Sequence, residues 1–125
     1  MRVYWTMPKT LIPFYQSELD GHRIEMDKGQ LQEAWNHLER AHILGQAWFV
    51  QHSSVHWKML CFGIRIKSVK EIVGQIPRLL IGGVKSFVGK IPVGNTGGAN
   101  VPAFRSMEIP ADLAVILESH KTIKW

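Results

Sequence analysis

The sequence is poor in cysteine, because Cys61 is the only one among 125 residues. An intrachain disulfide is therefore excluded, and this usage is typical of proteins from a reducing compartment such as the cytoplasm, where we expect this chain to reside. The same sequence lacks long apolar runs: none approaches the roughly 18 residues of a membrane span. Residues 1–9 carry no apolar segment of the secretory kind. These absences favour a soluble cytoplasmic protein.

Acidic side chains are scarce in the middle of the chain. Residues 40–90 contain eight basic side chains and one acid, Glu71, for a net charge of +7, whereas residues 1–39 contain four basic and six acidic ones, for a net charge of −2. We interpret the basic segment as a solvated helix surface, since it contains no motif that reads a nucleic-acid groove. The overall composition, 46% hydrophobic and 20% charged, is that of one globular domain over residues 1–125.

Apolar residues recur at spacings of three and four, which predicts an all-α fold. The expected helices span about 11–28, 30–44, 47–62 and 69–89, followed by a glycine- and proline-rich loop over 91–109 and a short helix over 110–119. Gly63 is expected to end the third helix, and Pro77 to kink or break the fourth. We expect a buried Cys61 thiol. The predicted solvated side of the fourth helix carries Lys67, Lys70, Arg78 and Lys85.

These helices are expected to form two stacked antiparallel hairpins. The turn at 27–30 and its echo at 67–72 are similar to the turns of tetratricopeptide repeats, although two hairpins fall short of the roughly three repeats that a solenoid needs. The sequence therefore favours a compact helical core over 11–90. The segment 94–98 lacks the Lys-Ser or Lys-Thr of a phosphate-binding loop, and we expect it to cover the helices.

A group of potential metal ligands lies on the second and third helices. His52 and His56 are four residues apart and share one helix face, and Glu39 and His42 are three residues apart on the preceding helix. At about 1.5 Å of rise per residue on either side of the turn near 45–46, the four groups fall at similar heights. This pattern predicts a site for a divalent transition metal such as Zn, Ni, Co, Cu or Fe.

Other interpretations stay open. The histidines are structural if the chain is a tetratricopeptide-like module that holds a protein partner or a second copy of itself. His22 would approach the same site from the first helix, whereas His37 is expected outside it. The amphipathic helix over 69–89 also suits contact with a membrane surface. The sequence indicates no catalytic residue and no substrate, so a binding protein is favoured over an enzyme.

Three blocks of the sequence carry a resemblance that runs from about residue 10 to about 113. They are AWNHLERAHILGQ over 34–46, HxxVHxxML over 52–60 and IPxGNTGGxNVxAF over 91–104. On these blocks the chain resembles an uncharacterised family of small bacterial proteins, a domain of unknown function. The resemblance implies an all-helical cytoplasmic domain without an assigned reaction, whose genes sometimes lie near transition-metal resistance functions. Glu39, His42, His52 and His56 match the family pattern.

Overall fold

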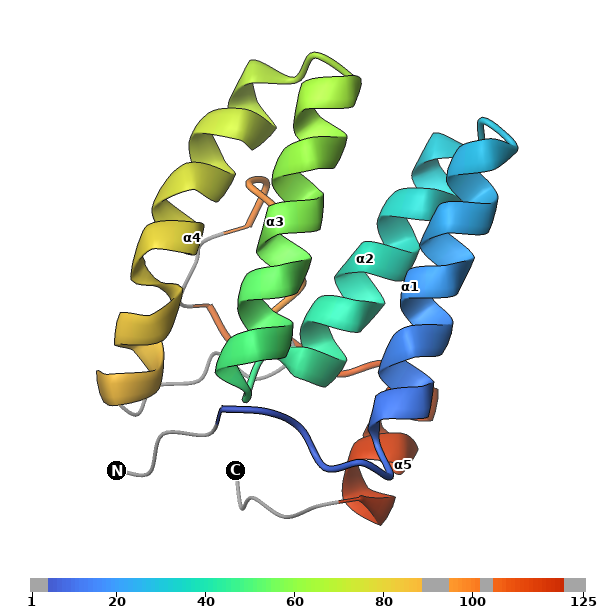
Figure 1. Ribbon diagram of the computed structural model, residues 1–125, viewed down its shortest axis with the longest axis vertical. Helices are drawn as coiled ribbons and strands as arrows, with labels where there is room; N and C mark the ends of the chain where they lie inside the picture. Colours follow the sequence, from blue (N-terminus) through green and yellow to red (C-terminus); the bar gives the residue numbers. More distant parts are fainter. Residues whose placement is uncertain (1–4, 89–94, 102–104, 121–125) are drawn as a thin grey trace.

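The computed structural model describes residues 5–88, 95–101 and 105–120, with side chains described up to residue 79 in the first range. These residues form helices without any strand among them, which confirms the predicted all-α class (Figure 1). The helices are α1 (Ile12–Asp27), α2 (Leu31–Gly45), α3 (Phe49–Arg65), α4 (Val69–Val88) and α5 (Ala111–Ser119).

The first four helices form two antiparallel pairs. α1 packs against α2 and α3 against α4, while the contact between α2 and α3 joins the pairs. Figure 1 shows the pairs side by side, closest near the short connection between α2 and α3 and diverging away from it. The short α5 packs on α2. The connection between α2 and α3 thus brings the end of one pair against the beginning of the other.

Helix ends follow local chemistry, with two corrections to the sequence analysis. α2 ends at Gly45, one residue beyond its predicted end, and Ser68 Oγ accepts the Glu71 backbone N–H at 3.3 Å, which caps the start of α4. Gly63 does not end α3, because the helix continues to Arg65. The glycine lies where α4 comes close to α3, and a Cβ at this position would lie 3.2 Å from the Glu71 Cβ. Pro77 does not break α4, which passes through it as one helix.

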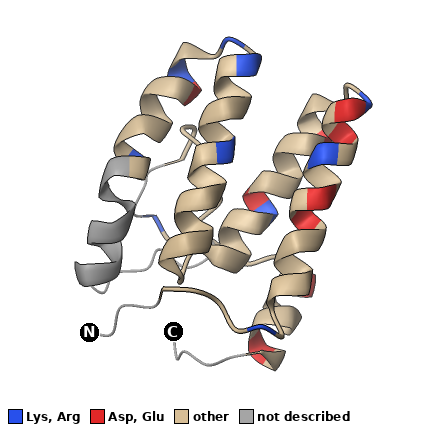
Figure 2. Cartoon of the chain, viewed as in Figure 1, with Lys and Arg blue, Asp and Glu red and all other residues tan. Residues whose placement is uncertain are grey.

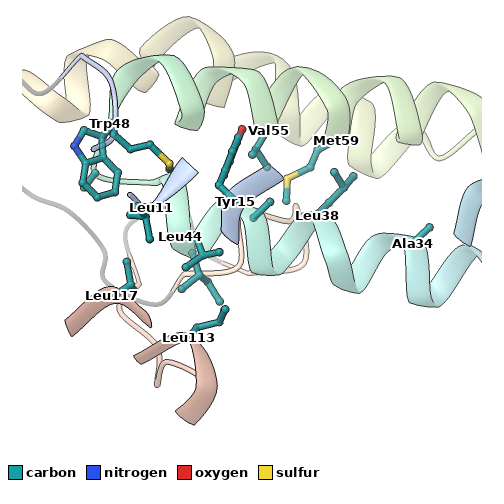
Figure 3. Close-up of a cluster of buried hydrophobic side chains, with 14 of the residues drawn as sticks. Leu11, Tyr15, Ala34, Leu38, Leu44, Trp48, Val55, Met59, Leu113 and Leu117 are labelled. Carbon is teal, nitrogen blue, oxygen red and sulfur yellow. The ribbon is translucent and has the colours of Figure 1, made fainter. Parts of the chain in front are cut away.

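A hydrophobic core fills the space where α1, α2, α3 and α5 meet (Figure 3). Leu11, Leu38 and Val55 are fully buried, each from a different segment of the chain. At about 25 cal/mol per Å² of apolar surface removed from water, such side chains supply most of the energy that holds the pairs together. The labelled core residues are Leu11, Tyr15, Ala34, Leu38, Leu44, Trp48, Val55, Met59, Leu113 and Leu117.

Charged side chains divide unevenly between the two helix pairs. Figure 2 shows acidic side chains mostly on α1 and α2 and basic ones on α3 and α4. Arg40 joins three helices, because its guanidinium contacts Glu18 of α1 at 2.9 Å and also Asp112 of α5. The interaction with Asp112 raises the pKa of Arg40 and lowers the pKa of Asp112. Within the described residues, no helix is both long and apolar enough to cross a bilayer.

Two side chains lie opposite to their predicted environments. Arg78 is 9% exposed, because its guanidinium donates to the carbonyls of Gly74 and Val101 where the segment 95–101 crosses α4. Helical spacing within α4 alone contains no information about that segment. Cys61 is exposed and lines a pocket with Trp57 and Lys58 of α3, on a face that the diverging helix pairs leave uncovered.

Candidate metal centre

Three histidines meet where α2 and α3 approach one another. His42 comes from the last turn of α2, and His52 and His56 come from the first two turns of α3. The rings are buried, with exposed fractions of 3%, 5% and 1% in that order. The sequence places them there because a short connection follows α2 and because His52 and His56 share the helix face that carries the buried Val55.

The imidazole rings point their Nε2 atoms at one another. The Nε2 of His42 lies 3.1 Å from that of His52 and 3.1 Å from that of His56, and the remaining pair is separated by 3.0 Å. Ring centroids are 4.6–5.0 Å apart, with steep angles between the ring planes. The nitrogens therefore form a nearly equilateral triangle, and together they are a group that could hold a metal ion.

The opposite ring nitrogens of two of these histidines contact oxygen atoms. The Nδ1 of His42 lies 2.6 Å from the backbone carbonyl oxygen of Asn95, and the Nδ1 of His56 lies 2.6 Å from the Oε1 of Gln75. A carbonyl oxygen only accepts hydrogen bonds, so each Nδ1 carries the proton and donates it. In the neutral rings, the Nε2 atoms of His42 and His56 then carry lone pairs.

These lone pairs limit what can lie between the rings. The Nε2 atoms of His42 and His56 lie 3.1 Å apart inside the protein, and the Nε2 of His52 lies 3.1 and 3.0 Å from them. A proton on the Nε2 of His52 would serve these lone pairs as a hydrogen-bond donor, whereas a metal ion would bind the lone pairs of all three nitrogens. Orientation of a metal-binding imidazole by a carbonyl oxygen on its other nitrogen is a common feature of metal sites.

The size of the triangle suits a first-row ion. A point in its plane equidistant from the nitrogens lies about 1.8 Å from each, so an ion at a typical Zn–N distance of about 2.0–2.1 Å would sit roughly 1 Å to one side. Three histidines would supply three of the four ligands of a tetrahedral site.

Glu39, the fourth predicted ligand, is not part of the group that the three histidines form. It lies one helical turn before His42 and is partly buried. Burial raises the pKa of the Glu39 carboxyl, and the negative charge of Glu71 adds to this effect. The structure thus gives three histidines in direct contact, with a carboxyl group further along α2.

The segment 95–101 lies against the histidines. Gly97 has a φ of +86°, a conformation that glycine adopts at little cost. A Cβ at this position would lie 2.5–2.8 Å from three atoms of the His42 ring, so only glycine fits here without displacing the ring. This close approach confirms the prediction that residues 94–98 cover the helices, for the part from residue 95 onward.

The other two histidines of the first two helices have partners elsewhere. The Nδ1 of His22 donates to the Ala34 carbonyl oxygen at 2.9 Å, and this histidine does not join the cluster. The Nδ1 of His37 lies 2.9 Å from a carboxylate oxygen of Glu18, outside the site as predicted.

Sequence reasoning missed three residues of the site, namely Gln75, Asn95 and Gly97. A signal for Gln75 is present, since Glu71, Gln75 and Arg78 form a polar row along the amphipathic α4. Asn95 contacts His42 through its backbone carbonyl, and a backbone contact is not revealed by residue identity. Gly97 stands in a sequence rich in glycine, and its contact with His42 depends on how the chain returns across α2.

The fold and site define a small all-helical protein with a buried cluster of three histidines. More particularly, the chain belongs to a family described as a protein of unknown function (DUF3703), whose model matches residues 9–117. No curated protein and no solved structure matched the chain.

Proposed function

We propose that this protein binds one divalent transition-metal ion through His42, His52 and His56. The observation that carries the proposal is the triangle of Nε2 atoms at 3.0–3.1 Å, in which the Nδ1 atoms of His42 and His56 donate to carbonyl oxygens. Imidazole ligands favour Zn, Ni, Co, Cu or Fe over Mg or Ca, which prefer oxygen. The role that follows is the handling of such an ion in the cytoplasm of a bacterium, including resistance to it.

In this proposal Glu39 acts as a charge partner. Three neutral imidazoles leave the full charge of the ion uncompensated, and a buried charge is costly without a counter-charge. The Glu39 carboxyl lies one turn from His42 and, once ionised, reduces that cost or binds the ion itself. Binding is therefore expected to release protons and to weaken as the pH falls.

The proposal is tested by metal analysis of the protein purified without an affinity tag. We expect about one equivalent of metal per chain after incubation with Zn²⁺ or Co²⁺ and removal of the excess. The affinity of the His52→Ala variant for the metal should fall by more than about 100-fold. Loss of a residue that only hydrogen-bonds a ligand typically costs about 10–100-fold, and His52 is proposed to bind the ion directly. With Co²⁺, the visible absorption of the bound ion gives the same measurement independently.

His37→Ala is the matched control, because His37 is a histidine of α2 that contacts Glu18 rather than the cluster. It should retain the full equivalent of metal. A wild-type protein that stays far below one equivalent, or a His52→Ala variant that binds like the wild type, would contradict the proposal.

A second candidate is a tetratricopeptide-like module that binds a protein partner. It is favoured by a row of exposed apolar side chains on α4, in which Val69 is 72%, Val73 61% and Ile76 45% exposed. Under this interpretation the histidines are structural, and His52→Ala changes the free energy of unfolding without changing the metal content.

A further inference from the structure

The segment 95–101 is attached to α4 by a row of polar side chains. Glu71, Gln75 and Arg78 lie on one side of the helix, at spacings of four and three residues. Each binds a different backbone group of the segment: the Glu71 carboxylate accepts the Ala99 N–H at 3.0 and 3.2 Å, Gln75 Nε2 donates to the Gly97 carbonyl at 2.9 Å, and the Arg78 guanidinium donates to the Val101 carbonyl at 2.8 Å.

These contacts fix the orientation of the Gln75 amide. Its Nε2 lies 2.7 Å from a carboxylate oxygen of Glu71 and 2.9 Å from the Gly97 carbonyl oxygen, and both of these atoms are acceptors. The amide nitrogen must therefore face them, which directs Oε1 to His56. Gln75 is buried with an exposed fraction of 0%, so water does not offer the amide another orientation.

The orientation of the amide determines which tautomer the neutral His56 ring adopts. Because Oε1 only accepts, the Nδ1 of His56 donates to it at 2.6 Å, and the neutral ring keeps a lone pair on Nε2, which faces the other two histidines. Without this acceptor, the ring gains access to the other tautomer, whose Nε2–H donates to a neighbouring Nε2 and does not bind metal.

The same segment also acts on His42. The Asn95 carbonyl oxygen accepts from its Nδ1 at 2.6 Å, and Gly97 lies over its ring. The side chain of Asn95 holds that turn in place, since its Oδ1 accepts the Gly97 N–H at 2.8 Å and its Nδ2 donates to the Arg105 carbonyl at 2.7 Å. Two of the three proposed ligands are thus oriented by one segment, His42 directly and His56 through Gln75.

We infer that Gln75 is a positioning residue of the metal site, and that docking of the segment 95–101 on α4 and binding of metal favour one another. This inference rests on the proposed function. The physical link is the chain of hydrogen bonds from the Ala99 N–H through Glu71 and Gln75 to His56. Coupling between two binding events is reciprocal. If docking of the segment raises the affinity for metal, bound metal therefore stabilises the docked segment by the same free energy.

The test compares two buried glutamines, each replaced by leucine. Gln75→Leu removes the acceptor of His56 and should weaken Zn²⁺ and Co²⁺ binding about 10–100-fold. Gln51→Leu is the control, because Gln51 is also buried but binds the backbone N–H of Met7 and the hydroxyl of Thr6. It should lower stability while leaving metal affinity within about twofold of wild type, since no cluster contact of its side chain is changed.

A double variant keeps the test decisive if Gln75→Leu does not fold. In Glu71→Gln/Gln75→Glu the carboxylate at position 75 accepts from the Nδ1 of His56 and from the amide at position 71, whose oxygen accepts the Ala99 N–H, while the Gly97 carbonyl loses its donor. A carboxylate acceptor makes the imidazole a stronger ligand, which offsets the lost Gly97 contact, so this variant should bind metal within tenfold of wild type. A loss of tenfold or more would overturn the role of position 75.

Hydrogen exchange measures the coupling itself. In the wild type, exchange of the Ala99 amide should slow when Zn²⁺ is added, and the slowing should be lost in Gln75→Leu. An exchange rate that Zn²⁺ leaves unchanged, or a Gln75→Leu variant with wild-type affinity, would overturn this inference while leaving the proposed function standing. A wild-type protein that binds no metal would overturn both.

Discussion

The histidines of this protein have different roles, because their ring nitrogens contact different partners. His22 differs from the three clustered histidines. It is half-buried between α1 and α2, it donates to a backbone carbonyl, and it is not part of the cluster. Burial lowers the pKa of His22 from its ordinary value of 6.5, and the charge of Lys58 acts in the same direction. The folded protein thus holds this ring in its neutral form more strongly than the unfolded chain does.

This lowered pKa predicts a pH dependence of stability. As the pH falls through 6.5, the unfolded chain takes up a proton at residue 22 before the folded protein does, so the free energy of unfolding decreases. His22→Asn keeps a donor for the Ala34 carbonyl but does not titrate. Urea denaturation at pH 7.5 and 5.5 should therefore show a smaller loss of stability in the variant than in wild type. An equal loss in both proteins would contradict the role assigned to His22.

At the same scale, the sequence was sufficient to bring the three histidines together but not to find the groups that orient them, and it wrongly added Glu39 to the group. His42, His52 and His56 could be placed together because helical rise and the length of one connection determine their heights. Gln75, Asn95 and Gly97 could not, because their contacts arise where a segment more than fifty residues from His42 along the chain returns across α2 and α4. The wrong prediction for Arg78 has the same cause, since that segment covers it.

Among the helices, α5 has the smallest contact with the rest of the molecule and the simplest energetics. It has nine residues, of which Leu113 and Leu117 are buried, and Asp112 adds the contact with Arg40. Such a helix is too short to be stable alone, so its two leucines hold it against α2. The side chain of Leu113 is fully buried in the common core.

Leu113→Ala should accordingly lower the free energy of unfolding by about 2–5 kcal/mol, through lost burial and the cavity that remains. Val115→Ala is the matched control on the same helix, because Val115 is 66% exposed, and it should change the free energy by no more than about 0.5 kcal/mol. Chemical denaturation measures both values. Similar effects of the two variants would mean that α5 does not pack as described.

The helices themselves were predictable to within a few residues, because the apolar spacing that defines a helix is local. The errors occur at Gly63, which was interpreted as a terminator, and at Pro77, where a break of the helix was one of the two predicted outcomes. Gly63 lies inside α3 because α4 passes close to it, and this tertiary contact has no local signature. Pro77 lies inside α4, and the Arg78 contact with the Val101 carbonyl attaches the helix to the segment 95–101 one residue further on.

In the molecule as a whole, the proposed ion would connect the two helix pairs. His42 belongs to the pair α1–α2, and His52 and His56 belong to α3–α4. Apart from the covalent connection, the pairs are held by the α2–α3 contact, by the shared core and by the segment 95–101, which contacts both α2 and α4. An ion with ligands in both pairs binds only when the pairs are assembled, so metal binding and the stability of the whole fold are linked.

This linkage predicts how far metal stabilises the protein. At a free Zn²⁺ concentration of about 100 times the dissociation constant, the free energy of unfolding should rise by about 2.7 kcal/mol, which corresponds to roughly 10 °C in Tm for a domain of this size. Calorimetry with added Zn²⁺ and with a chelator measures the difference. His56→Ala should unfold at the same temperature under both conditions, because the remaining histidines do not complete the triangle. If that variant gained as much stability as wild type, the ion would be binding somewhere other than between the two helix pairs.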